Sequence, residues 1–422
     1  MLPKIPFKIY IPIFRDFSHA MSFSAGCDNP GIGGTEFTSI KLAIFLAQRY
    51  PDLEVLLANE KYINIIDLPE NLSMSAFGNL NEFLEYISNT DDPSIVLCTM
   101  ALLEKTDLAV LRKLRSKLIV WLHHPFQINR TVRRLGFAAH VHVGGYQFFS
   151  NAPFYESNWH IQNIFTSSSY GPLRGLPTED SPLKIVYLGA LVRQKGFGVI
   201  ARQWPQLKRV WPRVELHVIG SSLTYSALPE NEFIPCNQKF AEEILSHIPK
   251  EDIEAGKVIF HGNLGSEKLD VMRSAHLAVL NPSGRTEAFP ASPIECMACG
   301  LPVVASGDLG MSDSMRFLPE LSVRGGHEIV DRVQWLISDQ RRYEELSARC
   351  ITIAKWFESQ NEVTIIKWMR LFERVMNVGN QKVPDSPPVE GLLGSRFKLW
   401  YRQLRALPGA YTRILLGREG PR

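Results

Sequence analysis

The chain has 422 residues, 45% of them hydrophobic and 21% charged, and its formal net charge is +3. This composition fits a soluble globular protein of two or three domains, and so small a positive excess predicts no nucleic-acid partner. Six cysteines are too few for a disulfide scaffold, and no apolar stretch is long enough to predict a transmembrane helix. The N-terminal segment has prolines and a lysine within its apolar part. It therefore predicts a first strand and not a signal peptide, and we expect a cytoplasmic protein.

Short apolar runs alternate with helical patterns along the first half of the chain. The predicted strands are Lys8–Phe14, Leu53–Ala58, Leu72–Phe77, Ile95–Thr99, Leu118–Leu122 and Val141–Val143. Between the first two, Phe37–Arg49 has a broad apolar helical face. Such alternation predicts a parallel sheet covered by helices. We therefore assign residues 1–165 to an N-terminal Rossmann-like domain.

A polar segment near Thr166–Pro182, with several glycines and prolines, has the composition of a linker. A second alternating series follows it, with strands at Lys184–Leu188, Glu215–Ile219, Val258–Phe260, Leu277–Leu280 and Val303–Ala305, and helices at Gly198–Val210, Ala241–His247, Glu267–Ser274 and Pro293–Ala298. We assign residues 183–350 to a C-terminal Rossmann-like domain. Within the long helical stretch Gln340–Val378, residues 351–378 are expected to cross back to the first domain. The predicted fold class is α/β, with two doubly wound domains facing each other across a cleft.

The segment Thr286–Ala305 predicts a loop, a helix, a glycine stop and a buried strand. Ser292 suits the helix N-cap, Pro293 the first helical position, and Glu295 the last position of a capping box. Glu287 lies in the loop facing the helix N-terminus, where free N–H groups and the helix dipole favour an anion. On local physics alone, Glu295 could be a capping residue and Glu287 a solvated loop carboxylate.

Three other segments have patterns typical of ligand loops. Val186–Phe197, V-Y-L-G-A-L-V-R-Q-K-G-F, follows a predicted strand, and its glycines and cations suit a diphosphate. Asn29–Phe37, N-P-G-I-G-G-T-E-F, has glycines that allow the backbone to approach a ligand closely. His123 and His124 come just after the carboxyl end of a strand, where open α/β sheets bind ligands. Each segment also has a purely structural interpretation. The lysine of the first could simply be exposed to solvent, the glycines of the second could form an ordinary turn, and the histidines of the third could belong to the core.

Together these segments resemble the signature of retaining glycosyltransferases of the GT-B fold, and glycosyltransferase family 4 in particular. Glu287 and Glu295 match its E-x7-E motif, between a P-S pair in Asn281–Ser283 and the run C-M-A-C-G-L-P-V-V-A-S. The resemblance implies that Glu287 contacts hydroxyls of the donor sugar and that Glu295 binds the ribose of the nucleotide.

The resemblance further implies that residues 1–165 bind the acceptor and that residues 183–350 bind the nucleotide-sugar donor. It also implies two further catalytic residues. Lys195 would stabilise the leaving diphosphate, and His123 would contact the donor sugar. The remaining donor-binding residues that it implies are Gly33, Gly34, Phe289 and Gly220, the last of these beside the nucleotide base.

The sequence departs from the family pattern at two positions. Ala190 stands where the family often has arginine, and we expect Arg193, three residues on, to replace it. Pro290 stands where the family usually has glycine, and because proline has no N–H, a backbone donor to the sugar is lost. No D-x-D pair occurs in the chain. We therefore expect no cofactor and no metal, with a lysine and helix dipoles replacing the cation.

The implied function is transfer of a hexosyl group from a nucleoside-diphosphate sugar to a hydroxyl acceptor, with retention of anomeric configuration. The acceptor would be a glycan or a lipid-linked molecule in cell-surface polysaccharide, lipopolysaccharide or glycolipid biosynthesis. Two alternatives stay open: a sugar-nucleotide epimerase of the same fold, and a non-catalytic sugar-nucleotide-binding protein. A donor panel, tested with and without acceptor for release of nucleoside diphosphate, discriminates between them.

The C-terminal segment, residues 392–422, has its own composition. Seven basic residues and one acidic residue follow position 392, so this segment has a net charge of +6 and the rest of the chain −3. Phe397, Trp400, Tyr401 and Leu404 share one face of a short basic helix. One interpretation is peripheral attachment to the inner face of the cell membrane, and the other is docking on the protein's own domain.

Overall fold

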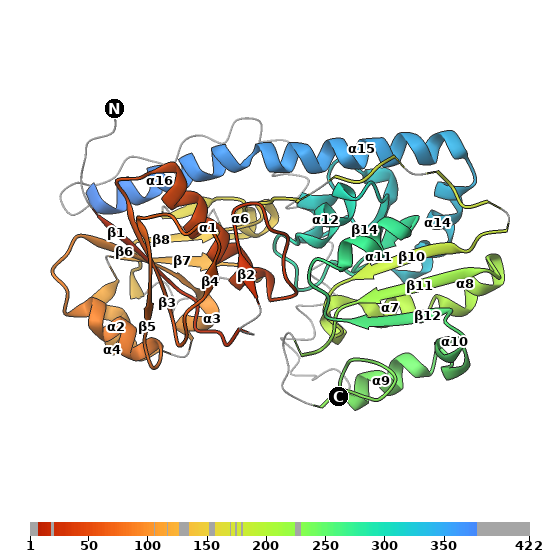
Figure 1. Ribbon diagram of the computed structural model, residues 1–422, viewed down its shortest axis with the longest axis horizontal. Helices are drawn as coiled ribbons and strands as arrows, with labels where there is room; N and C mark the ends of the chain where they lie inside the picture. Colours follow the sequence, from red (N-terminus) through yellow and green to blue (C-terminus); the bar gives the residue numbers. More distant parts are fainter. Residues whose placement is uncertain are drawn as a thin grey trace.

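The protein folds into two α/β domains that lie side by side (Figure 1). The computed structural model describes residues 7–377 except 18–20, 105, 116, 126–134, 152–156, 169, 174, 179 and 224–228. The predicted basic tail, residues 392–422, lies outside the described residues. Of the helices that the structure describes, none is both long and apolar enough to cross a membrane.

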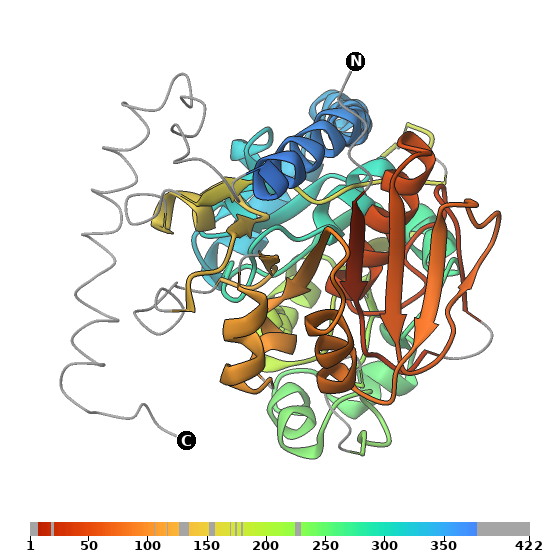
Figure 2. The same cartoon turned by 90° about the vertical axis from the view of Figure 1, so that its left-hand side faces the viewer.

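The N-terminal domain is built on a seven-stranded parallel sheet in the order β5-β3-β1-β6-β7-β8-β9. Its strands are β1 Lys8–Pro12, β3 Glu54–Asn59, β5 Leu72–Ala76, β6 Ser94–Thr99, β7 Leu118–Leu122, β8 Ala139–His142 and β9 Asn158–His160, and a separate pair is formed by β2 Ser22–Phe23 and β4 Asn64–Ile65. Its helices are α1 Gly34–Arg49, α2 Leu80–Ser88, α3 Met100–Leu103, α4 Leu108–Leu114 and α6 Gly145–Asn151. In Figure 2 this sheet faces the viewer.

Alternation of side chains along the strands divides the N-terminal core into two layers. In β1, Ile9 and Ile11 pack into the cluster that contains α1, whereas Tyr10 packs with α2 and α4 on the other face. Such two-sided burial explains why the strands appear as nearly continuous apolar runs in the sequence.

The C-terminal domain has a six-stranded parallel sheet in the order β12-β11-β10-β13-β14-β15. The strands are β10 Leu183–Leu188, β11 Val214–Ile219, β12 Val258–Gly262, β13 Leu277–Val279, β14 Val303–Ser306 and β15 Ser322–Val323. The α-helices are α7 Phe197–Ala201, α8 Trp204–Val210, α9 Gln238–Leu245, α10 Lys250–Glu254, α11 Lys268–Ser274, α12 Ser292–Ala298, α13 Met311–Met315 and α14 Ile329–Ile337, and short 3-10 turns are η2 Arg193–Lys195, η3 Pro319–Leu321 and η4 Gly326–Glu328.

Two long helices, α15 Gln340–Ser359 and α16 Asn361–Asn377, run along both domains (Figure 1). Helix α16 packs on the N-terminal domain, where Trp368 meets Trp121 edge-on with ring centroids 5.2 Å apart. The side chain of Asn361, at the break between the helices, accepts from Phe165 N at 3.0 Å and donates to Phe165 O at 2.6 Å. The chain passes between the domains twice, after Phe165 and again at Asn361, and these two bonds join the two crossings.

Several elements differ from the sequence-based expectation. The stretch expected as one helix over Gly198–Val210 is two, and α8 has a proline in its first turn, which cannot continue a preceding helix. The expected helical stretch from Gln340 to Val378 consists of two helices, which meet at Gln360. Helix α2, whose N-cap Asn79 accepts from Glu82 N, and the short strand β9 were not predicted.

Candidate active site between the two domains

A cavity of about 220 Å³ lies between the domains, at the carboxyl ends of strands from both sheets. From the C-terminal domain it is lined by residues that follow β10, β11 and β13, including Gly189, Gly220 and Asn281. From the N-terminal domain it is lined by the loop before α1 and by the residues after β7. In the C-terminal sheet these positions flank the central strand β10, where the strand order reverses. In the N-terminal sheet the order reverses between β1 and β6, and β7 is the next strand beyond β6. Ligands of open α/β sheets bind at this place.

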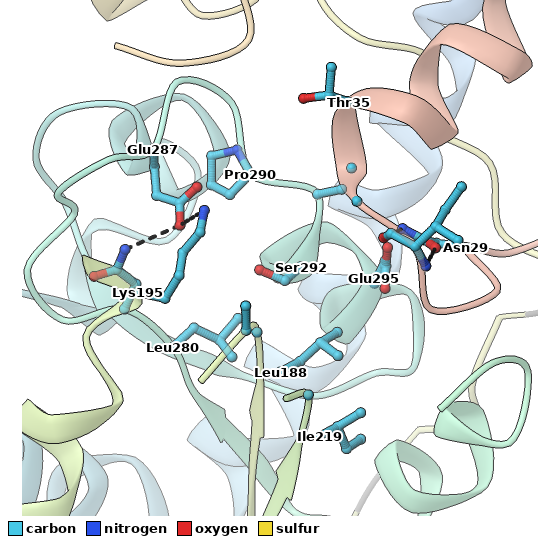
Figure 3. A pocket seen from close by; sticks show the side chains of 18 of the residues that line it. Asn29, Thr35, Leu188, Lys195, Ile219, Leu280, Glu287, Pro290, Ser292 and Glu295 are labelled. Carbon is cyan, nitrogen blue, oxygen red and sulfur yellow. Dashed lines mark hydrogen bonds and ion pairs between the residues drawn. The ribbon is translucent and has the colours of Figure 1, made fainter. Parts of the chain in front are cut away.

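At one side of the cavity, Lys195 and Glu287 form an ion pair (Figure 3). Lys195 Nζ lies 2.9 Å from Glu287 Oε1, and Asn281 Nδ2 donates to the same oxygen at 3.2 Å. The side chains of the pair are 20% and 11% exposed. Both charges are therefore shielded from bulk water and yet border the cavity, so each is available to a bound ligand.

The lysine and the glutamate meet because two loops are tied together. The turn η2 ends at Gly196, whose φ of +80° favours glycine and where a Cβ would lie 2.7 Å from Asn281 Oδ1. Tyr187 donates to the carbonyl of Lys195 at 3.1 Å from beneath. Thr286, also at positive φ, donates to Gln194 O at 3.3 Å. The backbone on both sides of the pair is thus fixed before any ligand binds.

A second ion pair lies elsewhere in the same cavity wall. Lys268 Nζ is 2.8 Å from Glu295 Oε2, with side chains 5% and 16% exposed. The predicted capping box is wrong: the N-cap of α12 is Ala291, no side chain caps the helix, and Ser292 is its first residue. Because a proline, which has no N–H, follows directly, the helix has one N–H fewer that needs an acceptor at this end. Glu295 is held by Lys268 instead.

The N-terminal wall contributes mainly backbone. Asn29 Oδ1 accepts from Gly31 N at 3.0 Å and from Ile32 N at 2.9 Å, which shapes the glycine loop. Gly31 has a φ of +92°, and a Cβ there would lie 3.0 Å from Leu264 O of the other domain. Gly33 and Gly34, next in the loop, line the cavity at the start of α1.

His123 also lines the cavity and packs against Trp121, with ring centroids 4.3 Å apart and the ring planes tilted by 52°. Its Nε2 is buried and has no hydrogen-bond partner within the described part of the chain. Burial, together with neighbouring His124, lowers the pKa of His123 to about 3. Burial and then Lys195 lower the pKa of His124 as well. The histidines are therefore neutral at physiological pH.

A second contact between the domains lies beside Glu287. A Cβ at Gly144 would overlap the carbonyl oxygen of Ala288. Next to it, Asp313 of α13 accepts from Gly145 N at 2.7 Å and is also bonded by Tyr146 N at the start of α6. Burial raises the pKa of Asp313 to about 6 despite these two bonds. The loop that carries Glu287 is therefore in direct contact with the N-terminal domain.

Eight of the nine residues that the sequence singled out line this one cavity: Gly33, Gly34, His123, Lys195, Gly220, Glu287, Phe289 and Glu295. Arg193 does not. Its guanidinium pairs with Glu243 of α9 at 3.0 Å and lies over the Phe240 ring. The expected substitute for the arginine missing at Ala190 is thus turned away from the cavity.

Sequence reasoning missed Asn281, Lys268 and Asp313. Asn281 stands just before the Pro-Ser pair that flanks the motif, so its position in the sequence could have indicated a residue of the site. Lys268 lies in a predicted helix, but nothing local indicates that its ammonium reaches a carboxylate 27 residues later. No group of three or more metal-ligating side chains occurs among the residues that the structure describes.

The topology and the cavity define a two-domain protein of the GT-B architecture, with Rossmann-like domains facing each other. Residues 174–355, the C-terminal domain, match the family model for glycosyl transferases group 1. No curated protein sequence matches the chain significantly.

Solved structures with the same architecture share little sequence with the chain. Sucrose-phosphate synthase from Thermosynechococcus elongatus superposes with a TM-score of 0.60 at 15% identity, over 88% of this chain and 99% of that one. Anabaena HepE in complex with UDP-glucose gives 0.58 at 15% identity, over 87% and 98%. The lipopolysaccharide outer core galactosyltransferase WaaB gives 0.53 at 15%, over 87% and 99%. At such identities the likeness establishes the fold.

Proposed function

We propose that the protein is a retaining glycosyltransferase of family 4 that transfers a hexosyl group from a nucleoside-diphosphate sugar to a hydroxyl acceptor. One observation carries the proposal: Lys195 and Glu287 meet within 2.9 Å at the wall of a cavity between two Rossmann-like domains. A cation for a leaving diphosphate and a carboxylate for sugar hydroxyls are the two groups this reaction needs. The match of residues 174–355 to glycosyl transferases group 1 supports it.

The chemical problem is to expel a diphosphate while positive charge develops on the sugar. Lys195 would stabilise the charge on the leaving group, in a site shielded from bulk water where a fixed cation acts strongly. Glu287, which Asn281 Nδ2 holds at 3.2 Å, would accept from hydroxyls of the sugar and orient it. In this arrangement no protein nucleophile is required.

His123 would act as a neutral hydrogen-bonding group. Because burial lowers its pKa to about 3, it carries no charge at working pH and cannot serve as a general acid there. Its buried Nε2, unpaired within the described residues, is available to a sugar hydroxyl. His123 would therefore position the donor and would not transfer a proton.

The remaining parts of the proposal concern donor and acceptor. Glu295 would bind the ribose, and the loops around Gly33 and Gly220 would approach the phosphates and the base. Anabaena HepE has been solved with UDP-glucose and WaaB is named a lipopolysaccharide outer core galactosyltransferase. These two neighbours support a reaction in cell-surface polysaccharide, lipopolysaccharide or glycolipid biosynthesis, with a glycan or a lipid-linked acceptor. We further propose that the reaction needs neither a cofactor nor a metal.

The test is a panel of UDP-, ADP- and GDP-sugars, assayed for release of nucleoside diphosphate with and without glycan acceptors, in the presence of EDTA. Glu287→Ala and Lys195→Ala are the test variants. Lys208→Ala is the matched control, because Lys208 pairs with Asp252 at 2.5 Å outside the cavity. Release of diphosphate by wild type and control, lost in both test variants, supports the proposal. Full activity in both test variants overturns the site.

The same assay separates the alternatives. An epimerase releases diphosphate without acceptor and returns an epimerised sugar, whereas a transferase depends on acceptor. A non-catalytic protein binds a donor and releases nothing. Nuclear magnetic resonance of the first glycoside formed establishes retention or inversion at the anomeric carbon.

Membrane contact is proposed for residues 392–422 alone. Flotation with anionic liposomes compares the full-length chain with one that ends at Gly391. Loss of liposome binding in the shorter chain supports peripheral attachment. Equal binding of the two chains to liposomes contradicts this proposal.

A further inference from the structure

The second ion pair of the cavity differs from the first in burial. Lys268 is 4% exposed as a residue, and its side chain is less accessible than that of Lys195, 5% against 20%. Its ammonium lies 2.8 Å from Glu295 Oε2. Lys195 borders open cavity and can turn to a phosphate, whereas Lys268 is enclosed around its one carboxylate partner.

Enclosure of this pair has no evident benefit for the fold. Removing two charges from water is energetically costly, and well-packed apolar residues often replace such pairs at no loss of stability. The pair lies at the wall of a polar cavity, where one oxygen of the carboxylate is bound and the other is not. Glu295 Oε1 has no hydrogen-bond partner within the part of the chain that the structure describes.

We infer that Lys268 is a positioning residue. It holds Glu295 by Oε2, so that Oε1 is presented in a fixed orientation to the ribose hydroxyls of the donor. The inference rests on the proposed function, in which Glu295 binds the ribose. It assigns to Lys268 no contact with the diphosphate and no direct role in the chemical step.

A carboxylate held in this way favours nucleotides that have both ribose hydroxyls. A hydrogen bond to a charged group contributes roughly tenfold or more to affinity. We therefore expect the wild type to prefer a nucleoside diphosphate over its 2′-deoxy or 3′-deoxy form by about tenfold. Without Lys268 the carboxylate is free to rotate, and the preference falls to about twofold or less.

The experiment measures nucleotide affinity by calorimetry, independently of turnover. UDP, ADP and GDP are titrated first, and the tightest binder is then compared with its 2′-deoxy and 3′-deoxy forms. The variants are Lys268→Met, Lys268→Arg, Glu295→Gln and the double variant Lys268→Met with Glu295→Gln. Lys208→Met is the matched control, since it removes a lysine from a carboxylate pair in the same domain but outside the cavity. Thermal unfolding verifies that each variant is folded.

The inference predicts that Lys268→Met loses the ribose preference, that Lys268→Arg retains most of it, and that the control retains all of it. It further predicts that the double variant binds as Glu295→Gln does, because a residue acting through another has no effect once that other is removed. A Lys268→Met variant that weakens ribose and deoxyribose forms equally overturns the inference, as does an additive double variant. If no nucleoside diphosphate binds the wild type, the proposed function itself fails.

Discussion

The C-terminal wall of the cavity carries two lysines and two glutamates, arranged as the pairs Lys195–Glu287 and Lys268–Glu295. The N-terminal wall, in its described lining residues, carries no charged side chain: it consists of the glycine loop, two histidines, and small or amide side chains. One domain therefore supplies the charges that a nucleotide sugar requires. The other supplies shape and closes the cavity by direct backbone contact. The two walls should respond differently to substitution, by loss of chemistry on one side and by loss of fit on the other.

The largest effect is expected from the first ion pair. Glu287→Gln and Lys195→Met remove one charge each with little change in shape, and each should lower kcat by about 100- to 1,000-fold. The expected cause is loss of charge stabilisation, so the change should appear in kcat more than in KM. Steady-state release of nucleoside diphosphate measures both constants. Activity within threefold of wild type in either variant would contradict the assignment of the catalytic charges to the C-terminal wall. Lys208→Met serves as the control.

At the second contact between the domains, Gly144→Ala should have the next largest effect. The added methyl group would overlap the carbonyl oxygen of Ala288, beside Glu287, and would force the domains apart. A displacement of about 1 Å can reduce turnover by up to roughly 100-fold, and we expect a loss of about ten- to 100-fold in kcat/KM. Gly26→Ala is the matched control, because a Cβ there meets no atom within 4 Å. Equal activity of the two variants would show that the contact between the domains is dispensable.

The interdomain contact at Asp313 should make stability depend on pH. Its pKa is about 6 in the folded protein against about 3.9 in an unfolded chain. The folded state thus binds the extra proton between these values, and the stability that the protonated carboxyl contributes is complete below about pH 4 and is lost as pH rises through 6. The amide that replaces this carboxyl in the variant Asp313→Asn cannot ionise, so the variant lacks this pH dependence.

Urea unfolding of wild type and Asp313→Asn at pH 4.5 and pH 7.5 tests this. The free energy of unfolding of Asp313→Asn, relative to wild type, should rise by up to about 2 kcal/mol between the two pH values, after allowance for the partial exposure of the carboxyl. A difference that stays constant with pH would mean that the carboxyl is ionised throughout this range.

The contrast between the walls also explains how much the sequence could predict. The charged residues of the C-terminal wall belong to motifs with local constraints: Glu287 and Glu295 stand on either side of one loop, and Lys195 precedes a glycine that must adopt positive φ. Strands buried on both faces gave clear apolar runs, so most strands of the two sheets were predictable, whereas the short strand β9 and several helices, α2 among them, were not. Contacts that depend on chain segments far apart were not, and Lys268 with Glu295 and Asp313 with Gly145 are of this kind.

The smallest effect is expected from Arg193, where sequence and structure disagree. The family pattern suggests that this arginine replaces the one missing at Ala190, but its guanidinium pairs with Glu243 on the outer side of the loop and is 49% exposed. An exposed pair of this kind contributes at most about 1 kcal/mol to stability. Arg193→Ala should accordingly change kcat and KM by no more than about twofold, measured beside Lys195→Met. A loss of tenfold or more would show that the guanidinium leaves Glu243 when the donor binds. Arg193 would then join the two lysines and two glutamates of the C-terminal wall in the donor-bound protein.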